Sequence, residues 1–208
     1  MAEVIIDIWS DYVCPFCYLQ VPALKQAVRD LQLQLRWRSY ELRPEPAPLL
    51  DPRGDYLRQV WDGSVYPMAQ REKMVLRLPP IQPRSRKAAE AAEFARAKGR
   101  FEQMHLQLFK TFFEDGRNIG ELNVLLDVGA ASGLYAQDLL GSLQTGEYAP
   151  KVLADEKLAK RLNITAVPAL VMHYSSQPVE AGILATGTYN FKELEKRLAN
   201  FKRMPVPR

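Results

Sequence analysis

The sequence predicts an α/β fold in which a small sheet-forming module is interrupted by a large all-helical insertion. Two strand-like patterns, residues 4–9 and 33–42, flank a helical stretch at the start of the chain. A proline-rich segment, residues 43–54, ends this module, and helical signals follow it to residue 146. Strand signals then return. We therefore expect residues 1–45 and 147–208 to form one domain and residues 46–146 to form the insertion.

The first module contains two strands of different kinds. Residues 4–9 are nearly all apolar, which is typical of a central strand covered on both faces. Asp7 is the exception, and two roles are open for it: a polar residue near a strand end, or a buried carboxylate that moves protons for Cys17. Residues 33–42 instead alternate apolar and polar side chains. The helix between the strands, residues 18–31, contains Pro22 and is expected to be kinked there.

The insertion is predicted to contain helices at residues 67–76, 85–98 and around 122–130. Between the last two, four apolar side chains recur at helical spacing, which is more typical of a hydrophobic core than of a cofactor pocket. They are Phe101, Met104, Leu108 and Phe112. His105 lies beside this stripe, and we expect a core or surface histidine there rather than a catalyst.

The C-terminal part is predicted to contain a helix that opens at Pro150, a short strand at residues 182–186 and a last helix. Asn190-Phe191-Lys192-Glu193 resembles a capping box for that helix, with Asn in place of Ser or Thr. The basic, proline-rich tail, residues 202–208, is expected to be frayed.

The composition is that of an ordinary globular protein. Of the 208 residues, 47% are apolar, and the net charge is only +4 at pH 7. Because Lys and Arg are scattered among acidic residues, we do not expect a nucleic-acid partner. No apolar run approaches the length of a membrane span, and no signal peptide is visible. We therefore expect a cytoplasmic protein that does not bind a membrane.

Both cysteines of the chain lie in one motif, Cys14-Pro15-Phe16-Cys17, at the turn between the first strand and the first helix. Two cysteines placed at random in such a chain would stand three apart only about 1% of the time, so chance is a poor explanation. In an intracellular protein, this pair in a strand–turn–helix setting indicates a thioredoxin-like redox site.

The spacing of the pair suits thiol–disulfide exchange. At a helix N-terminus the Cys14 sulfur faces unpaired backbone N–H groups and the positive end of the helix dipole, which favour the thiolate. That thiolate attacks a substrate disulfide and forms a mixed disulfide. Cys17, one turn along the helix, is placed to attack this intermediate and release the product. Pro15 fits the first helical turn, and Phe16 adds neither a charge nor a polar donor.

Two structural interpretations of the pair are weaker. A disulfide between the two cysteines would close a tiny loop and add little stability. A zinc site normally needs four ligands, and the distant His105 and His173 supply the remaining two poorly. We therefore expect no metal, and no cofactor beyond a redox-active disulfide between Cys14 and Cys17.

A second motif is Val167-Pro168, which stands where an apolar, strand-like run begins. A proline does not belong inside a central strand. A proline that immediately precedes one is a candidate for a cis peptide bond, here between Val167 and Pro168.

The layout resembles the DsbA family, a thioredoxin-like fold with a large inserted helical domain, and most closely its FrnE-like branch. The segments that carry the resemblance are Asp11-Tyr12-Val13-Cys14-Pro15-Phe16-Cys17-Tyr18, Tyr40-Glu41-Leu42-Arg43-Pro44, residues 85–99 with Phe101, and Ile164-Thr165-Ala166-Val167-Pro168. The resemblance implies a thiol–disulfide oxidoreductase with Cys14 as nucleophile and Cys17 as resolving thiol. It also implies that Pro168 is a cis-proline opposite the pair, where the preceding backbone pairs with a substrate strand.

The sequence departs from the FrnE-like pattern in two places. Gly187-Thr188-Tyr189-Asn190 stands where relatives often carry Gly-Ala-Gln-Pro, so the surface beside the site is expected to differ in substrate choice. Some FrnE-like proteins also carry a second cysteine pair near the C-terminus. This chain has none, which excludes an internal electron relay.

Two other functions stay open. Kappa glutathione transferases and hydroxychromene-carboxylate isomerases resemble the same scaffold, but they typically carry Ser at the position of Cys14 and lack the second cysteine. A peptide-binding chaperone module would instead use the groove between the two domains, with apolar side chains at Tyr12, Phe16 and Tyr18.

The resemblance implies protein or peptide disulfides as substrates. Glutathione, which is also a candidate co-substrate, or a thioredoxin-type protein would recycle the pair. The direction of electron flow and the natural substrate stay open. So does the oligomeric state, for which the apolar helices of the insertion would supply a homodimer surface.

Overall fold

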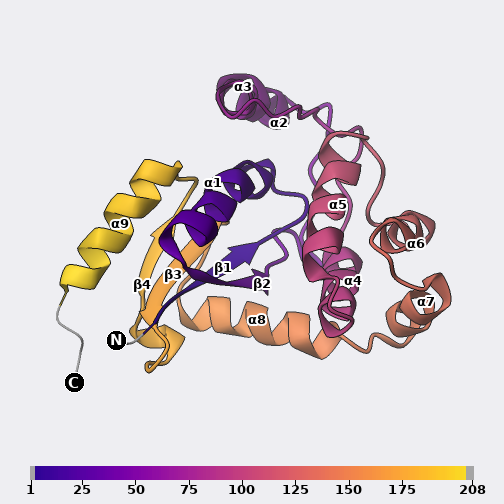
Figure 1. Cartoon of the computed structure of the whole chain (residues 1–208). Helices are drawn as coiled ribbons and strands as arrows, with labels where there is room; N and C mark the ends of the chain where they lie inside the picture. Colours follow the sequence, from indigo (N-terminus) through magenta and orange to yellow (C-terminus); the bar gives the residue numbers. More distant parts are fainter. Residues whose placement is uncertain (1–2, 205–208) are drawn as a thin grey trace.

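The computed structural model describes residues 3–204, and its centre is a four-stranded sheet covered by helices on both faces (Figure 1). The strands are β1 (Val4–Ser10), β2 (Gln34–Ser39), β3 (Ala169–Tyr174) and β4 (Ile183–Thr186). Their order across the sheet is β2-β1-β3-β4, and β2 runs parallel to β1 while β3 and β4 are antiparallel to their neighbours. Parallel neighbours need a crossover connection, and helix α1 (Pro15–Leu31) supplies it between β1 and β2.

The remaining helices fall into two groups along the chain. Between β2 and the return to the sheet lie α2 (Asp55–Val60), the π-helical segment η1 (Trp61–Val65), α3 (Tyr66–Arg71), α4 (Arg86–Ala97), α5 (Phe101–Phe113), α6 (Leu122–Ala131) and α7 (Ala136–Thr145). The sheet module is completed by α8 (Ala149–Arg161), the short 3₁₀ turn η2 (Val179–Ala181) and α9 (Phe191–Arg203). The expected α/β class with an inserted helical region is confirmed, whereas its boundaries at residues 46 and 146 stay a prediction.

Strand β1 is buried along its whole length, as its continuous apolar pattern predicted. On one face, Ile6 and Ile8 pack with Leu24 of α1 and Leu198 of α9. On the other face, the Trp9 indole donates a hydrogen bond of 3.0 Å to a backbone carbonyl of α8. Strand β1 thus lies in the middle of a helix–sheet–helix sandwich. The loop that follows it lies at one end of that sandwich.

Helix α1 begins earlier than the predicted residue 18. Pro15 occupies its first turn, and the helix continues through Pro22 to Leu31. At the other end of the chain, the predicted capping box at Asn190 is confirmed, because Asn190 Oδ1 accepts from the Glu193 N–H while Glu193 Oε2 accepts from the Asn190 N–H. Helix α9 runs to Arg203, past the predicted start of the frayed tail. Residues 205–208 of that tail lie outside the described residues.

Two predicted elements are longer than the observed ones. The helix predicted over residues 67–76 ends at Arg71, because Lys73 adopts a left-handed φ of 55° and the Met74 N–H bonds back to the Ala69 carbonyl at 2.9 Å. The strand predicted over residues 33–42 covers only Gln34–Ser39, since it is an edge strand whose partner β1 ends at Ser10. Helices α2 and α7 and the π-helical segment lie in the stretch up to residue 146 that was predicted to be helical, but they were not predicted individually.

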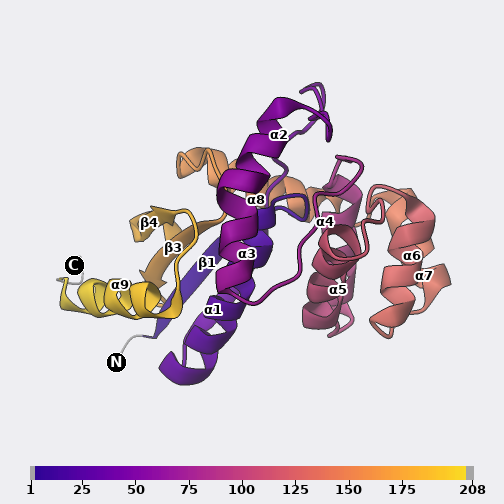
Figure 2. The same ribbon diagram turned by 90° about the horizontal axis from the view of Figure 1, so that it is seen from above.

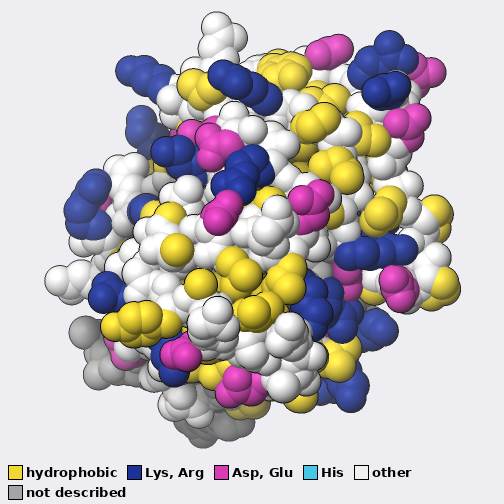
Figure 3. Space-filling model, turned by 90° about the vertical axis from the view of Figure 1, so that its right-hand side faces the viewer, with side chains coloured by type: hydrophobic (Ala, Val, Ile, Leu, Met, Phe, Trp, Pro, Cys, Tyr) yellow, Lys and Arg dark blue, Asp and Glu magenta, His cyan; other side chains and the backbone are white. Residues whose placement is uncertain are grey.

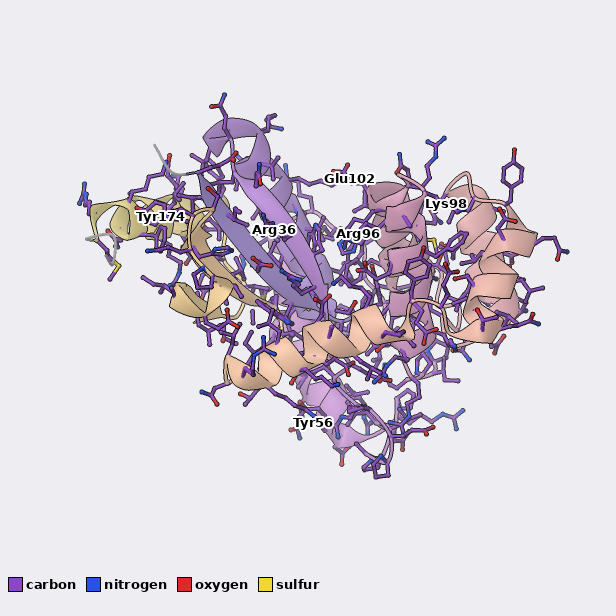
Figure 4. All side chains as sticks on the ribbon, turned by 90° about the horizontal axis from the view of Figure 1, so that it is seen from below. Arg36, Tyr56, Arg96, Lys98, Glu102 and Tyr174 are labelled. Atoms are coloured by element: carbon purple, nitrogen blue, oxygen red, sulfur yellow. The ribbon has the colours of Figure 1, made fainter. Side chains whose placement is uncertain are left out.

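The insertion packs against the sheet module through α4 and α5, which lie beside α1 in Figure 2. Helix α4 has small buried side chains, which let the neighbouring helices approach it closely. These side chains are Ala88, Ala91, Ala92 and Ala95. The predicted apolar stripe of α5 is core, with Met104, Leu108 and Phe112 fully buried. Arg96 of α4 lies between β2 and α5 (Figure 4) and donates a hydrogen bond to the Trp37 carbonyl at 3.1 Å. One hydrophobic cluster therefore spans both parts of the chain.

The surface is mixed in character. Figure 3 shows acidic and basic side chains interspersed with hydrophobic ones over the face on which α6 and α7 lie. Within residues 3–204, no helix is both long enough and apolar enough to cross a membrane.

Candidate active site

The Cys14-Pro15-Phe16-Cys17 motif lies where β1 gives way to α1. Cys14 is the N-cap residue of the helix, with an extended backbone, and Pro15 takes the first helical position, where its missing N–H is not needed. The Cys17 N–H bonds to the Cys14 carbonyl at 3.1 Å. No side-chain hydrogen bond caps this end of the helix.

The two thiols are free, buried and close together, but their surroundings differ. Burial raises the pKa of the Cys17 thiol well above its ordinary value, and the neighbouring Cys14 sulfur raises it further. The Asp11 backbone and the Ser10 hydroxyl act in the opposite direction and offset only part of this. Cys17 is therefore held in its protonated form, as a thiol.

Val167 and Pro168 meet the cysteine motif from the other side. The peptide bond between them is cis, and β3 begins directly after it at Ala169. The Cys14 thiol donates to the Val167 carbonyl at 3.5 Å, although the two residues are 153 positions apart. The structure thus brings together Cys14, Cys17, Val167 and Pro168, while Pro15 and Phe16 are half-buried in the first turn of α1.

A groove of about 570 Å³ lies along α1 and reaches Leu19, two residues beyond Cys17. Its walls come from α1, the end of α3, the loop that joins β4 to α9, and the first turn of α9: Leu19, Ala23, Met68, Arg71, Glu72, residues 188–190 and Glu193. The same loop is tied to the second motif, because the Gly187 N–H donates to the Pro168 carbonyl at 2.9 Å. In Figure 2, α3 lies across the start of α1, so the insertion supplies the far wall of the groove.

Asp11 is a buried acid at this site, and no role was predicted for it from the sequence. Its carboxylate accepts hydrogen bonds from the backbone N–H groups of Leu42 at 2.7 Å and Val13 at 3.2 Å. Burial nevertheless raises its pKa to about 6, because these donors and the Ser85 side chain compensate only partly for lost hydration. An acid three residues before a cysteine motif is a weak signal, and only the tertiary burial makes it unusual.

Asp7, considered above as a proton carrier for Cys17, is engaged elsewhere. Its carboxylate is fully buried and pairs with Arg38 Nε at 2.5 Å and with His173 Nε2 at 2.8 Å. None of the hydrogen bonds among residues 3–204 joins Asp7 to Cys17. The contacts favour a structural role for Asp7.

The two histidines belong to separate hydrogen-bonded groups. None of the hydrogen bonds among residues 3–204 joins either histidine to Cys14 or Cys17. His105 Nδ1 bonds to the Tyr12 hydroxyl at 2.9 Å, and burial, with the nearby charges of Arg96 and Lys25, lowers the His105 pKa to about 3. His173 bonds to Asp7. In the part of the chain that the structure describes, no three His, Cys, Asp or Glu side chains gather in a way that could hold a metal ion.

Comparison with known proteins gives a consistent result. Residues 5–199 match the DSBA-like thioredoxin domain family. The protein YwbO of Bacillus subtilis (strain 168) is 31% identical over 181 residues, which is 85% of this chain and 90% of YwbO. The crystal structure of the probable DsbA oxidoreductase SCO1869 from Streptomyces coelicolor has a TM-score of 0.81 at 21% identity and covers 99% of this chain and 94% of its own.

The structure of a 2-hydroxychromene-2-carboxylate isomerase is also similar, with a TM-score of 0.74 at 16% identity over 96% of each chain. At such identities the likeness concerns the fold. The thioredoxin-like fold with an inserted helical region, as in DsbA, is therefore confirmed.

Proposed function

The chain belongs to the DSBA-like thioredoxin domain family, and we propose that it is a thiol–disulfide oxidoreductase acting on protein or peptide disulfides. The observation that carries this proposal is the contact of 3.5 Å between the Cys14 thiol, at the start of α1, and the carbonyl of Val167, just before Pro168. The motif segments given above further support a place on the FrnE-like branch of the family.

The proposed reaction gives different roles to the two cysteines. The Cys14 thiolate attacks one sulfur of a substrate disulfide, so that a Cys14–substrate disulfide forms and the other substrate sulfur leaves as a thiolate. Cys17 then loses its proton and attacks the Cys14 sulfur. A Cys14–Cys17 disulfide forms, the second substrate thiol is released, and two electrons have passed from the protein to the substrate. Run in reverse, the same steps oxidise a substrate dithiol.

The asymmetry of the pair supports this assignment. Because its raised pKa keeps Cys17 protonated, the first attack falls to Cys14 at the helix N-terminus. The proposed substrate segment lies extended beside Val167, pairs with the backbone there and continues into the groove between α1, α3 and residues 188–190.

Single cysteine substitutions test the proposed roles. We expect Cys14→Ser to abolish reduction of a peptide disulfide, because no nucleophile remains at the helix end. We expect Cys17→Ser to accumulate a mixed disulfide with the peptide, because the resolving thiol is missing; mass spectrometry of the intact protein detects the adduct. A Cys14→Ser protein as active as the parent would overturn the proposal.

The equilibrium reduction potential of the pair decides the direction of electron flow. A value near or below about −230 mV in a glutathione titration favours a reductase, whereas about −180 to −120 mV favours an isomerase or oxidant. If no reversible intramolecular disulfide forms, the glutathione-dependent transferase or isomerase replaces the present proposal. Non-covalent binding of glutathione to Cys14→Ser would then be the discriminating measurement.

A further inference from the structure

Gln20 lies on the active-site helix, three residues after Cys17, and contacts the loop that walls the groove. We propose that Gln20 is a positioning residue: by holding residues 187–190 against α1, it sets the groove and hence the affinity for extended disulfide substrates. This inference rests on the proposed function, because it concerns the substrate groove of the same site.

The contact between Gln20 and the loop uses both ends of the side-chain amide. Gln20 Nε2 donates to the Tyr189 carbonyl at 2.9 Å, and the Tyr189 N–H donates to Gln20 Oε1 at 2.6 Å. Gln20 is only 1% exposed. A buried amide without partners is costly, so this side chain has one good arrangement, in which it pairs with the Tyr189 backbone as a neighbouring strand would.

The residues on either side of Tyr189 contact other parts of the site, so the position of Tyr189 affects the shape of the groove. Gly187 is tied to Pro168 by a hydrogen bond of 2.9 Å, and the Thr188 hydroxyl contacts the Met68 sulfur of α3 at 4.0 Å. Asn190 is fixed as the cap of α9. Thr188 therefore spans from the loop to the opposite wall of the groove, and the Gln20–Tyr189 pair is the anchor next to it.

The same contacts predict which kinetic constant changes when Gln20 is substituted. None of the hydrogen bonds among residues 3–204 joins the Gln20 amide to Cys14 or Cys17, and the cysteines are held by the first turn of α1. Loss of the anchor should therefore weaken binding of a substrate long enough to enter the groove. A disulfide that reaches only the sulfurs should be affected little.

The test compares two disulfides on the whole protein. For Gln20→Ala we expect KM for a ten-residue peptide with one disulfide to rise about tenfold with kcat within about twofold. We expect kcat/KM for 2-hydroxyethyl disulfide to change by less than about twofold. Leu198→Val, a buried change on α9 outside the groove, controls for lost stability and should leave both substrates unaffected. Amide hydrogen exchange should show lost protection at Tyr189 in Gln20→Ala alone.

Gln20→Glu supplies a second variant. A carboxylate keeps the acceptor for the Tyr189 N–H but repels the Tyr189 carbonyl, whereas a protonated carboxyl restores the donor. We therefore expect its peptide KM to approach the parent value as pH falls, a trend that a purely structural role would not produce. Equal losses on both disulfides, or an unchanged peptide KM in Gln20→Ala, would overturn the inference. A parent protein inactive on both disulfides would instead refute the proposed function.

Discussion

Buried polar side chains in two regions of the molecule, one between the sheet and α8 and one at the end of β1 and on α5, differ in whether they have charged partners. Beneath α8, Arg38 pairs with Asp7 at 2.5 Å and with Asp155 at 2.9 Å, while Lys151 adds a second cation to Asp155 at 2.7 Å. His173 bonds to the other oxygen of Asp7. Each buried carboxylate in this cluster therefore has a cationic partner, as buried charges require.

Asp11, three residues before Cys14, and His105 of α5, which bonds to the Tyr12 hydroxyl, are also buried, and none of the ion pairs among residues 3–204 includes either residue. Burial instead favours their neutral forms, which raises the pKa of Asp11 to about 6 and lowers that of His105 to about 3. The comparison teaches that equally buried polar groups differ in whether a charged partner compensates for the hydration they have lost. Shifted groups are typical of functional sites, and Asp11 stands three residues before Cys14 of the proposed one.

The largest expected effect comes from breaking the paired cluster. Arg38→Met removes the cation from Asp7 and Asp155, both almost completely buried, and should lower the free energy of unfolding by about 4 kcal/mol. Arg36→Met, an exposed position on the same strand (Figure 4), is the matched control and should cost less than about 0.5 kcal/mol. Urea denaturation measures both, and equal effects would show that the pairing is dispensable.

Asp11 should make stability fall as pH rises. Its folded pKa of about 6 lies above the ordinary 3.8, so between these values the folded state binds more protons than the unfolded state. Going from pH 4 to 7, this group should cost roughly 2.4 kcal/mol of unfolding free energy. The Asp11→Asn variant should lack that loss, and parallel slopes for the two proteins would contradict the assignment.

His105 should act in the opposite sense and more weakly over the accessible range. Because its folded pKa of about 3 lies below the ordinary 6.5, its contribution is present above pH 6.5 and declines as pH falls toward 3. From pH 7 to 5 the loss should be about 2 kcal/mol, and His105→Gln, which gains no charge, should not show it. Urea midpoints across pH for the single variants separate the two slopes, which partly cancel in the parent between pH 4 and 6.

Much of the site was predictable because its signals are local. A proline after Cys14 at a helix start, an apolar strand before it and the Asn190 capping box are all properties of neighbouring residues. The π-helical segment was not, since it lies between two α-helices and differs from them in its backbone hydrogen bonds rather than in its residue pattern. Gln20 was missed for another reason: nothing near it in sequence indicates a partner 169 residues away.

The sequence by itself determined the α/β layout, the redox motif at a helix start and the boundary signals of the main elements, because short-range sterics and hydrophobic periodicity decide them. Only the tertiary structure decided that Cys14 meets Val167, that Asp7 pairs with Arg38 and His173, and that Gln20 anchors Tyr189. It also decided the shifted pKa values of Asp11 and His105, since burial and the charges that surround a group depend on segments brought together from across the chain.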